Sequence, residues 1–218
     1  MRDRLSGAAM PVTAKICGLS THDTVGAAVR GGASHVGFVF FPPSPRNLGF
    51  EQAAALCSRV PGHVGKVGVF VDPDDALLGA ALATGLTAVQ LHKVTPERAA
   101  TIRSRIPVWV AVAVKTRADI DQAARFRGSA DRILYDAKTP EGATLPGGMG
   151  LRFDWKLLEG FDHPLPWALS GGLDAENVGD AIGITGARLV DVSSGVESAP
   201  GVKDVDKIAA FMQAVARS

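Results

Sequence analysis

The sequence predicts a single (β/α)8 TIM barrel of the α/β class, and three observations support this prediction. The chain has 218 residues, which suits one large domain near the lower end of the size range of such barrels. Short apolar runs rich in β-branched residues alternate with longer Ala-rich segments of helical period, as expected for parallel strands covered by helices. Glycine is abundant, at 25 residues, which suits many tight turns between strands and helices.

Eight segments have the composition of buried strands, and each ends near a cluster of Gly, Ser, Asp or Pro. In chain order they are 12–16, 35–40, 64–71, 87–92, 108–114, 131–136, 166–170 and 188–193. Several helices are expected to follow a side-chain cap, and their predicted starts are Thr21, Gly49, Asp74, Thr95, Arg117, Asp154, Asp174 and Lys203. A doubly wound open sheet is the structural alternative, but the ICGLS segment after the first strand lacks the Gly-x-Gly-x-x-Gly pattern of dinucleotide-binding sheets.

The domain organisation and the cellular setting follow from composition. We expect residues 11–218 to form the barrel domain and residues 1–10 to be a flexible N-terminal extension. The net charge of +1 at pH 7, without long runs of like charge, argues against a nucleic-acid partner. No stretch reaches the roughly 18 apolar residues of a membrane span. Two cysteines, Cys17 and Cys57, are too few for a disulfide framework and indicate a cytoplasmic protein, while no protein partner can be identified.

The spacing of the strands points to one end of the barrel as the functional face. The two longest intervals between strand starts follow the second and sixth strands, and they contain the loops 41–48 and 137–150. Loops that follow barrel strands form the catalytic face of this fold. We therefore expect these two loops to contribute to a site.

Cys17 stands at the end of the first strand, where it is a candidate base or nucleophile. Residues two apart on a strand share a face, so Lys15 and Cys17 point to the same side. A nearby cation makes a thiol ionise more easily, and only the thiolate acts as a base near neutral pH. The simpler interpretation is a small buried hydrophobic residue, and for Cys57, at core spacing in a helical segment, that interpretation is preferred.

Two aspartates stand at equivalent strand ends. Asp136 closes the sixth strand and is either an acid/base group or the cap of the segment that follows. Asp191, on the eighth strand, could approach Lys15 or Cys17 across the seam of a closed barrel. An ion pair between Asp191 and Lys15 that holds the barrel shut is compatible with a functional role.

Glycine-bearing segments follow the last three strands and predict a phosphate site. Bare backbone N–H groups and a helix N-terminus attract anions, and loops after strands seven and eight commonly hold phosphate in this fold. The helix predicted near Asp174 would add its positive end, and a substituent on one of these glycines would crowd the anion or block a positive φ. The predicted phosphate-binding residues are Gly148, Gly150, Gly171, Gly172, Ser194 and Gly195.

An ordered set of motifs covers nearly the whole chain from Val12 onward: KICG, GFVFFPPSPRNL, VGVFVD, VQLH, LYDAK, GGMGLRFDW, ALSGGLDAENV and VDVSSGVESAPGVKD. Together these motifs resemble the phosphoribosylanthranilate isomerases of tryptophan biosynthesis. The resemblance implies an Amadori rearrangement of N-(5-phosphoribosyl)anthranilate to 1-(2-carboxyphenylamino)-1-deoxyribulose 5-phosphate. It implies no metal and no cofactor, and the binding partner is then a small phosphorylated aminosugar.

The resemblance also implies roles for individual residues. By motif position, Asp136 is the acid that opens the sugar ring and Cys17 is the base that removes the proton from sugar carbon 2. Arg46 is expected to bind the anthranilate carboxylate, because a guanidinium matches a planar carboxylate, and His92 and Asp191 are expected to contact substrate. The chain departs from the family pattern at Lys93, where glycine is usual, and at Met149, which could narrow the phosphate loop.

Three other functions are weighed against this one. A metal-dependent pentulose-phosphate epimerase would need several His and acidic ligands at strand ends, where His92 is the only histidine. The aminoaldose isomerase of the histidine pathway uses the same chemistry, but it carries an aspartate where Cys17 stands. A catalytically silent phosphate-binding barrel would have lost the acid or the base, and both candidates are present.

Overall fold

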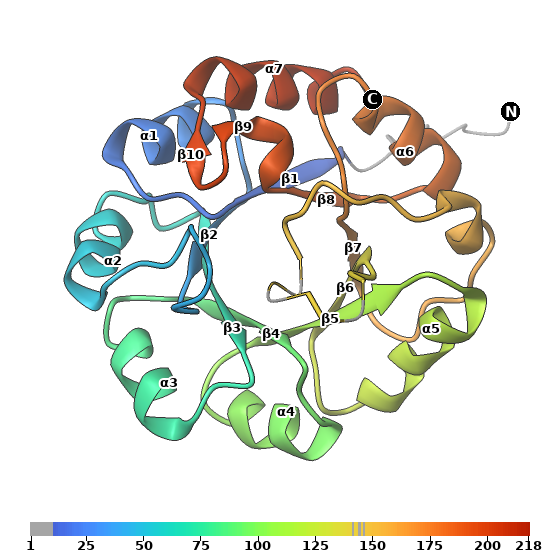
Figure 1. Cartoon of the computed structure of the whole chain (residues 1–218), viewed down its shortest axis with the longest axis horizontal. Coiled ribbons are helices and arrows are strands. Elements are labelled where there is room, and N and C mark those ends of the chain that lie inside the picture. The colour runs from blue at the N-terminus through green and yellow to red at the C-terminus, as the bar shows by residue number, and fades with distance from the viewer. Residues whose placement is uncertain (1–10, 141, 144, 146) are drawn as a thin grey trace, which may run out of the picture.

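The computed structural model describes residues 11–140, 142–143, 145 and 147–218. The extension predicted over residues 1–10 lies outside the described part of the chain. In the view of Figure 1, the strands form a central ring and the helices surround it.

Eight parallel strands, all within the described residues, close into a barrel in chain order. They are β1 (Thr13–Cys17), β2 (His35–Val39), β3 (Gly65–Val71), β4 (Ala88–His92), β5 (Val108–Val114), β6 (Arg132–Ala137), β7 (Trp167–Leu169) and β8 (Leu189–Val192). The pairing of β1 with β8 closes the ring. The predicted fold class is therefore confirmed, the strand limits agree within about one residue, and the open-sheet alternative is wrong.

Seven α-helices in the described residues cover the barrel. They are α1 (His22–Arg30), α2 (Phe50–Cys57), α3 (Asp75–Leu82), α4 (Pro96–Arg103), α5 (Arg117–Asp121), α6 (Val178–Thr185) and α7 (Val205–Ala216). Side chains of Thr21, Asp74 and Thr95 cap the N-termini of α1, α3 and α4 by accepting backbone N–H groups, as predicted. The described residues also form three short 3-10 helices: η1 (Gln122–Phe126), η2 (Trp155–Leu158) and η3 (Ser194–Val196).

Three predicted helix starts are wrong, each for a local reason. The segment at Asp154 forms only η2, because Gly160 with φ of 63° and the prolines beyond it end the turn. Asp174 and Asn177 exchange side-chain to backbone hydrogen bonds in a turn, and α6 begins after them. Lys203 belongs to an unpredicted hairpin of β9 (Glu197–Ala199) and β10 (Val202–Lys203), and α7 follows it.

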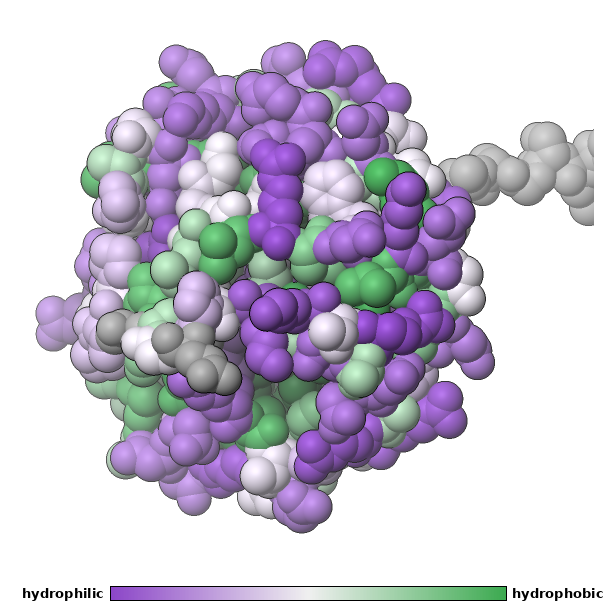
Figure 2. Space-filling view, turned by 45° about the vertical axis from the view of Figure 1, so that its right-hand side comes forward, coloured by the Kyte–Doolittle hydropathy of each residue, from purple (hydrophilic) through white to green (hydrophobic). Residues whose placement is uncertain are grey.

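The strands alternate between two cores. Residues that face outward, such as Ile16, Phe38 and Tyr135, pack with the helices in the large hydrophobic cluster. Residues that face inward fill the barrel. The layer nearer the N-terminal ends of the strands, called the lower layer below, is formed by Val67, Ala88, Trp109, Leu134, Ala168 and Leu189. Hydrophilic residues predominate over the face shown in Figure 2, with apolar residues visible between them.

Candidate active site

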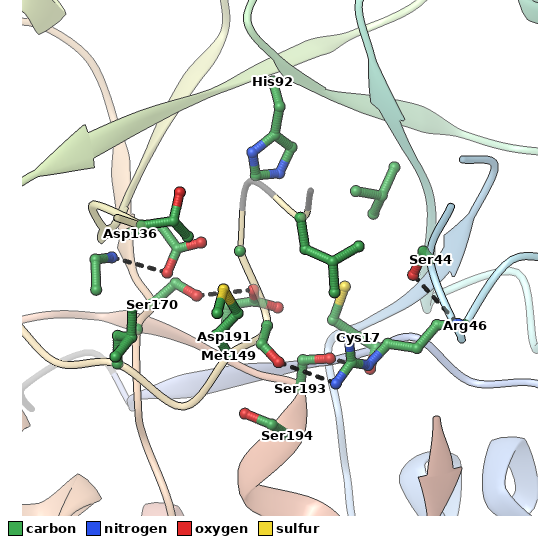
Figure 3. Close-up of a pocket in the computed structure, with 18 of the residues that line it drawn as sticks. Cys17, Ser44, Arg46, His92, Asp136, Met149, Ser170, Asp191, Ser193 and Ser194 are labelled. Atoms are coloured by element: carbon green, nitrogen blue, oxygen red, sulfur yellow. Dashed lines mark hydrogen bonds between the residues drawn. The ribbon is translucent and has the colours of Figure 1, made fainter. Parts of the chain in front are cut away.

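A cavity lies at the C-terminal ends of the barrel strands. It is lined by side chains from strand ends, by the long loops after β2 and β6, and by the glycine segments after β7 and β8. Figure 3 shows the labelled side chains arranged around this space. Ten predicted site residues line it: Cys17, Arg46, His92, Asp136, Gly148, Gly150, Asp191, Gly171, Gly172 and Ser194.

The thiol of Cys17 lies in the cavity directly above Lys15. A Cβ built on Gly37, in the neighbouring strand, would lie 2.9 Å from the Cys17 sulfur and 3.1 Å from Lys15 Cε, so glycine leaves room for both side chains. Burial raises the pKa of Cys17, and the opposing effect of Lys15 does not cancel it. The prediction that Lys15 makes the thiol ionise easily is therefore right for the contribution of the lysine and wrong for the net result. Cys57 is buried in α2 and does not line the cavity.

Asp136 ends β6 inside the same cavity and is the strongest candidate acid. Burial, reinforced by the negative charge of Asp191, raises the pKa of Asp136 to about 7. The carboxyl Oδ1 accepts a hydrogen bond of 2.9 Å from the backbone N–H of Ala137. Near neutral pH a substantial fraction of this group is a neutral carboxylic acid that can donate a proton.

Asp191 forms the predicted ion pair across the barrel seam. Lys15 on β1 lies opposite Asp191 on β8, and the ammonium donates to Asp191 Oδ1 at 2.7 Å. Ser170 Oγ donates to Asp191 Oδ2 at 3.2 Å. Burial acts to lower the pKa of Lys15, but Asp191 and Cys17 outweigh it and raise that pKa. Asp191 therefore lines the cavity and also pairs with Lys15 across the barrel seam.

His92 ends β4 at the edge of the cavity and is buried. Burial and the positive charges of Lys15 and Lys93 lower the pKa of His92 to about 4, so the ring is neutral at physiological pH. Its Nε2 lies 3.0 Å from the amide nitrogen of Gln90. Lys93 has a φ of 55°, in the left-handed region that glycine adopts without strain.

Arg46 is a buried residue of the cavity wall. Its Nε and Nη2 donate to the two carboxylate oxygens of Glu197 at 2.7 and 2.8 Å, and Nη2 also donates to the Gly148 carbonyl. Lys203 Nζ donates to Glu197 Oε1 at 2.6 Å. Two cations, Arg46 and Lys203, thus share the single carboxylate of Glu197. Within the described part of the chain no second carboxylate pairs with this cluster, so the cluster carries a net positive charge.

The glycine segments after β6, β7 and β8 meet on one rim, as predicted. Gly148, Gly150, Gly171 and Gly172 all have positive φ, which accounts for glycine at these positions. A Cβ on Gly172 would meet the side chain of Arg152 and the backbone carbonyl oxygens of Leu151 and Gly150, and Gly150 is itself one of the predicted phosphate-binding residues. A substituent on Gly172 would therefore crowd this rim and would sit at a positive φ of 63°, and its effect on a bound anion stays a prediction.

Two further details of this rim differ from the sequence predictions. Gly195 does not line the cavity, because its Cα packs against Leu173, where an added Cβ would overlap the carbonyl oxygen. The helix expected to point its positive end at this rim from Asp174 begins only at Val178. Met149 lines the cavity but leaves 47% of its surface exposed.

Sequence reasoning missed Gln90, Ser170, Glu197 and Lys203. Glu197 and Lys203 lie within a motif that was quoted as a whole, and nothing in their spacing predicts the hairpin that brings them to Arg46. Gln90 was detectable, because it shares a strand face with His92.

In the described ranges, no group of three or more His, Cys, Asp or Glu side chains could hold a metal ion. Among the described helices, none has both the length and the apolar character that a membrane crossing requires. The chemical groups that line the cavity are instead an acid (Asp136), a thiol (Cys17), a neutral imidazole (His92) and a wall rich in positive charge.

The barrel and this cavity define an α/β-barrel enzyme equipped for acid–base chemistry on an anionic ligand. The family model for N-(5'-phosphoribosyl)anthranilate (PRA) isomerase matches residues 14–214. The chain is 59% identical over 210 residues to N-(5'-phosphoribosyl)anthranilate isomerase of Zymomonas mobilis subsp. mobilis, covering 94% of this chain and 99% of the relative. The chain belongs to the N-(5'-phosphoribosyl)anthranilate isomerase family.

Solved structures agree with this membership. Phosphoribosylanthranilate isomerase from Thermotoga maritima superimposes with a TM-score of 0.85 at 39% identity, covering 94% of this chain and 98% of that one. A phosphoribosylanthranilate isomerase in complex with reduced 1-(o-carboxyphenylamino)-1-deoxyribulose 5-phosphate gives a TM-score of 0.82 at 37% identity, with the same coverage. The predicted enzyme class, an isomerase of tryptophan biosynthesis, is confirmed.

Proposed function

We propose that the cavity performs the Amadori rearrangement of N-(5-phosphoribosyl)anthranilate, with Asp136 as general acid and Cys17 as general base. Asp136 protonates the oxygen of the furanose ring, the bond from that oxygen to carbon 1 breaks, and an imine forms with the anthranilate nitrogen. Cys17 then removes the proton from carbon 2, and the electron pair moves to give the enamine that tautomerises to the aminoketose. The rearrangement conserves all atoms and electrons, so it needs no co-reactant.

The single observation that carries this assignment is the burial of the Asp136 carboxyl in the cavity, within reach of the negative charge of Asp191. The Asp136 pKa of about 7 keeps much of the carboxyl neutral, as a ring-opening acid requires. The carboxylate left after proton transfer is stabilised by the Ala137 N–H and by Lys15, both of which favour the charged form. Cys17 must react as its thiolate, and the positive charges of Lys15 and Lys203 are the groups that lower its pKa against the effect of burial.

The anionic ends of the substrate have separate places in the proposal. Arg46, held against Glu197, faces the anthranilate carboxylate, and the net positive charge of its cluster with Lys203 favours an anion there. His92 and Asp191 contact the sugar. The phosphate lies among Gly148, Gly150, Gly171, Gly172 and Ser194, which line the cavity and supply backbone N–H groups, and the prediction for Gly195 is not carried forward. The complex of a family member with a phosphorylated product analogue supports such a site.

A fluorescence assay that follows the loss of phosphoribosylanthranilate by the purified protein tests the function directly, and we expect turnover without added metal or cofactor. Inorganic phosphate should inhibit competitively. Ser194→Asp, which places a negative charge on the rim, should raise KM by about tenfold or more, and Arg46→Ala should lower kcat/KM. No turnover would refute the function, whereas turnover without phosphate competition would refute only the phosphate site.

The pathway and the composition support a cytoplasmic location. Both Cys17 and Cys57 are free thiols in the structure. The ligand we propose is a small phosphorylated aminosugar, and nothing in the charge pattern favours nucleic acid.

A further inference from the structure

A chain of hydrogen bonds runs through the barrel interior from β8 to β4. Lys15 Nζ donates to Asp191 Oδ1 at 2.7 Å and to Gln90 Oε1 at 2.9 Å. The amide nitrogen of Gln90 lies 3.0 Å from His92 Nε2. Lys15, Gln90 and His92 are all buried, so water does not compete for these bonds.

The chemistry of these groups leaves one arrangement of protons. The ammonium of Lys15 can only donate, so the atom of Gln90 that faces it must be the carbonyl oxygen. The amide NH₂ of Gln90 must then face His92, and it can only donate. His92 Nε2 is therefore an acceptor without a proton. A neutral imidazole carries its one proton on the other nitrogen, which is Nδ1.

The Nδ1 atom has no hydrogen-bond partner in the part of the chain that the structure describes. It is also not sealed in the protein, since Trp155 Nε1 is the only fully buried side-chain N or O atom without a partner among the described residues. His92 lines the cavity, and its Cε1 edge lies near Asp136: a Cβ on Gly147 would be 2.5 Å from Asp136 Oδ2 and 3.8 Å from His92 Cε1.

We propose that Gln90 is a positioning residue that fixes His92 as the neutral Nδ1–H tautomer, so that His92 donates a hydrogen bond to a sugar oxygen of the substrate beside Asp136. His92 is then a donor and cannot serve as a general base. The tautomer follows from this structure alone, while the donation to the sugar rests on the proposed function.

Long-range proton–nitrogen NMR correlation on ¹⁵N-labelled protein at neutral pH tests the tautomer without any activity assay. The signals of His92 are assigned by their loss in His92→Asn. We expect a protonated Nδ1 and an unprotonated Nε2. In Gln90→Glu the carboxylate can only accept, so the proton should move to Nε2. A wild-type ring with its proton on Nε2, or a charged ring, would overturn the proposal even if no Gln90 variant folds.

Kinetics of the same variants test the donation. Gln90→Glu and Gln90→Leu should each lower kcat/KM by about tenfold, the scale of one hydrogen bond, while Gln213→Glu, an exposed control on α7, should match the wild type. Unchanged kcat/KM in a Gln90→Glu protein with a reversed tautomer would contradict the donation. Absence of isomerase activity in the wild type would refute the proposed function and leave the tautomer intact.

Discussion

Two residues along a strand separate the lower half of the barrel interior from the upper half. On β6, Leu134 is fully buried in the apolar lower layer, and Asp136 lines the cavity. On β4, Ala88 belongs to the same lower layer, and Gln90 lines the cavity. Since strands rise about 3.3 Å per residue, the side chains that only pack and the side chains that line the cavity are about one side-chain layer apart.

The two halves contribute differently to the free energy of unfolding. The lower layer stabilises the fold by removing apolar surface from water. The upper half buries an ion pair between Lys15 and Asp191 and a carboxyl group at Asp136, and burying charged groups costs free energy unless they are fully paired. Substitutions of equally buried residues should therefore lower the free energy of unfolding in the lower half, and lower turnover in the upper half.

The largest effect is expected on turnover, in the upper half. Cys17→Ala and Asp136→Asn should each lower kcat by at least about 100-fold, the usual scale for the loss of an acid or base. Both proteins should keep the circular dichroism spectrum of the wild type. Cys57→Ala is the control, because Cys57 lies in α2 outside the cavity. Loss of turnover in Cys57→Ala, with normal turnover in Cys17→Ala, would mean that the wrong thiol has been assigned.

In the lower half, Leu134→Ala should destabilise the protein by about 2–5 kcal/mol, since it leaves a cavity in a closely packed layer. Denaturant unfolding measures this loss. The folded variant should keep kcat within a few-fold of the wild type, because the strand end that carries Asp136 is unchanged. A fall in kcat as large as that of Asp136→Asn would remove the distinction between the two layers.

Asp136→Asn should have the opposite effect on stability. The pKa of Asp136 is about 7 in the folded protein, above its ordinary value of 3.8. The stability that this carboxyl contributes is therefore fully present below pH 3.8 and is lost as pH rises through 7. Relative to the wild type, Asp136→Asn should gain about 2–4 kcal/mol at pH 8 and little at pH 4. An equal difference at both pH values would contradict the raised pKa.

The smallest effect concerns the rim, at Lys93. A left-handed backbone costs a non-glycine residue about 1–2 kcal/mol, whereas glycine loses more entropy on folding. Lys93→Gly should therefore change the free energy of unfolding by no more than about 1 kcal/mol, towards greater stability. Lys115→Gly, at an exposed residue without positive φ, should destabilise instead. If both glycine variants shift the thermal unfolding temperature in the same direction, backbone strain at Lys93 does not account for the stability change in Lys93→Gly.

The barrel could be predicted because its signal repeats along the chain. Each strand carries its own run of β-branched residues, so an error at one unit does not change the fold class. The helix starts at Asp154, Asp174 and Lys203 could not be predicted, because side-chain hydrogen bonds and a small hairpin compete locally with helix formation.

The candidate site divides in the same way. Asp136, His92 and Asp191 could be found because strand ends of a barrel meet on one face. The partner of Arg46 could not, because Glu197 reaches it from 151 residues away through an unpredicted hairpin. The net effect on the thiol of Cys17 also escaped, since the degree of burial that opposes Lys15 is a property of the folded barrel.

The pH dependence of kcat/KM in the wild type and in Asp136→Asn tests the assignment of acid and base most directly. A neutral Asp136 and a thiolate at Cys17 must coexist. The raised pKa of Cys17 means that activity should rise about tenfold per pH unit up to about pH 7, and level off above it as Asp136 loses its proton. The weak residual activity of Asp136→Asn should keep rising through pH 7. A break near pH 7 that persists in Asp136→Asn would contradict the assignment of Asp136 as the acid.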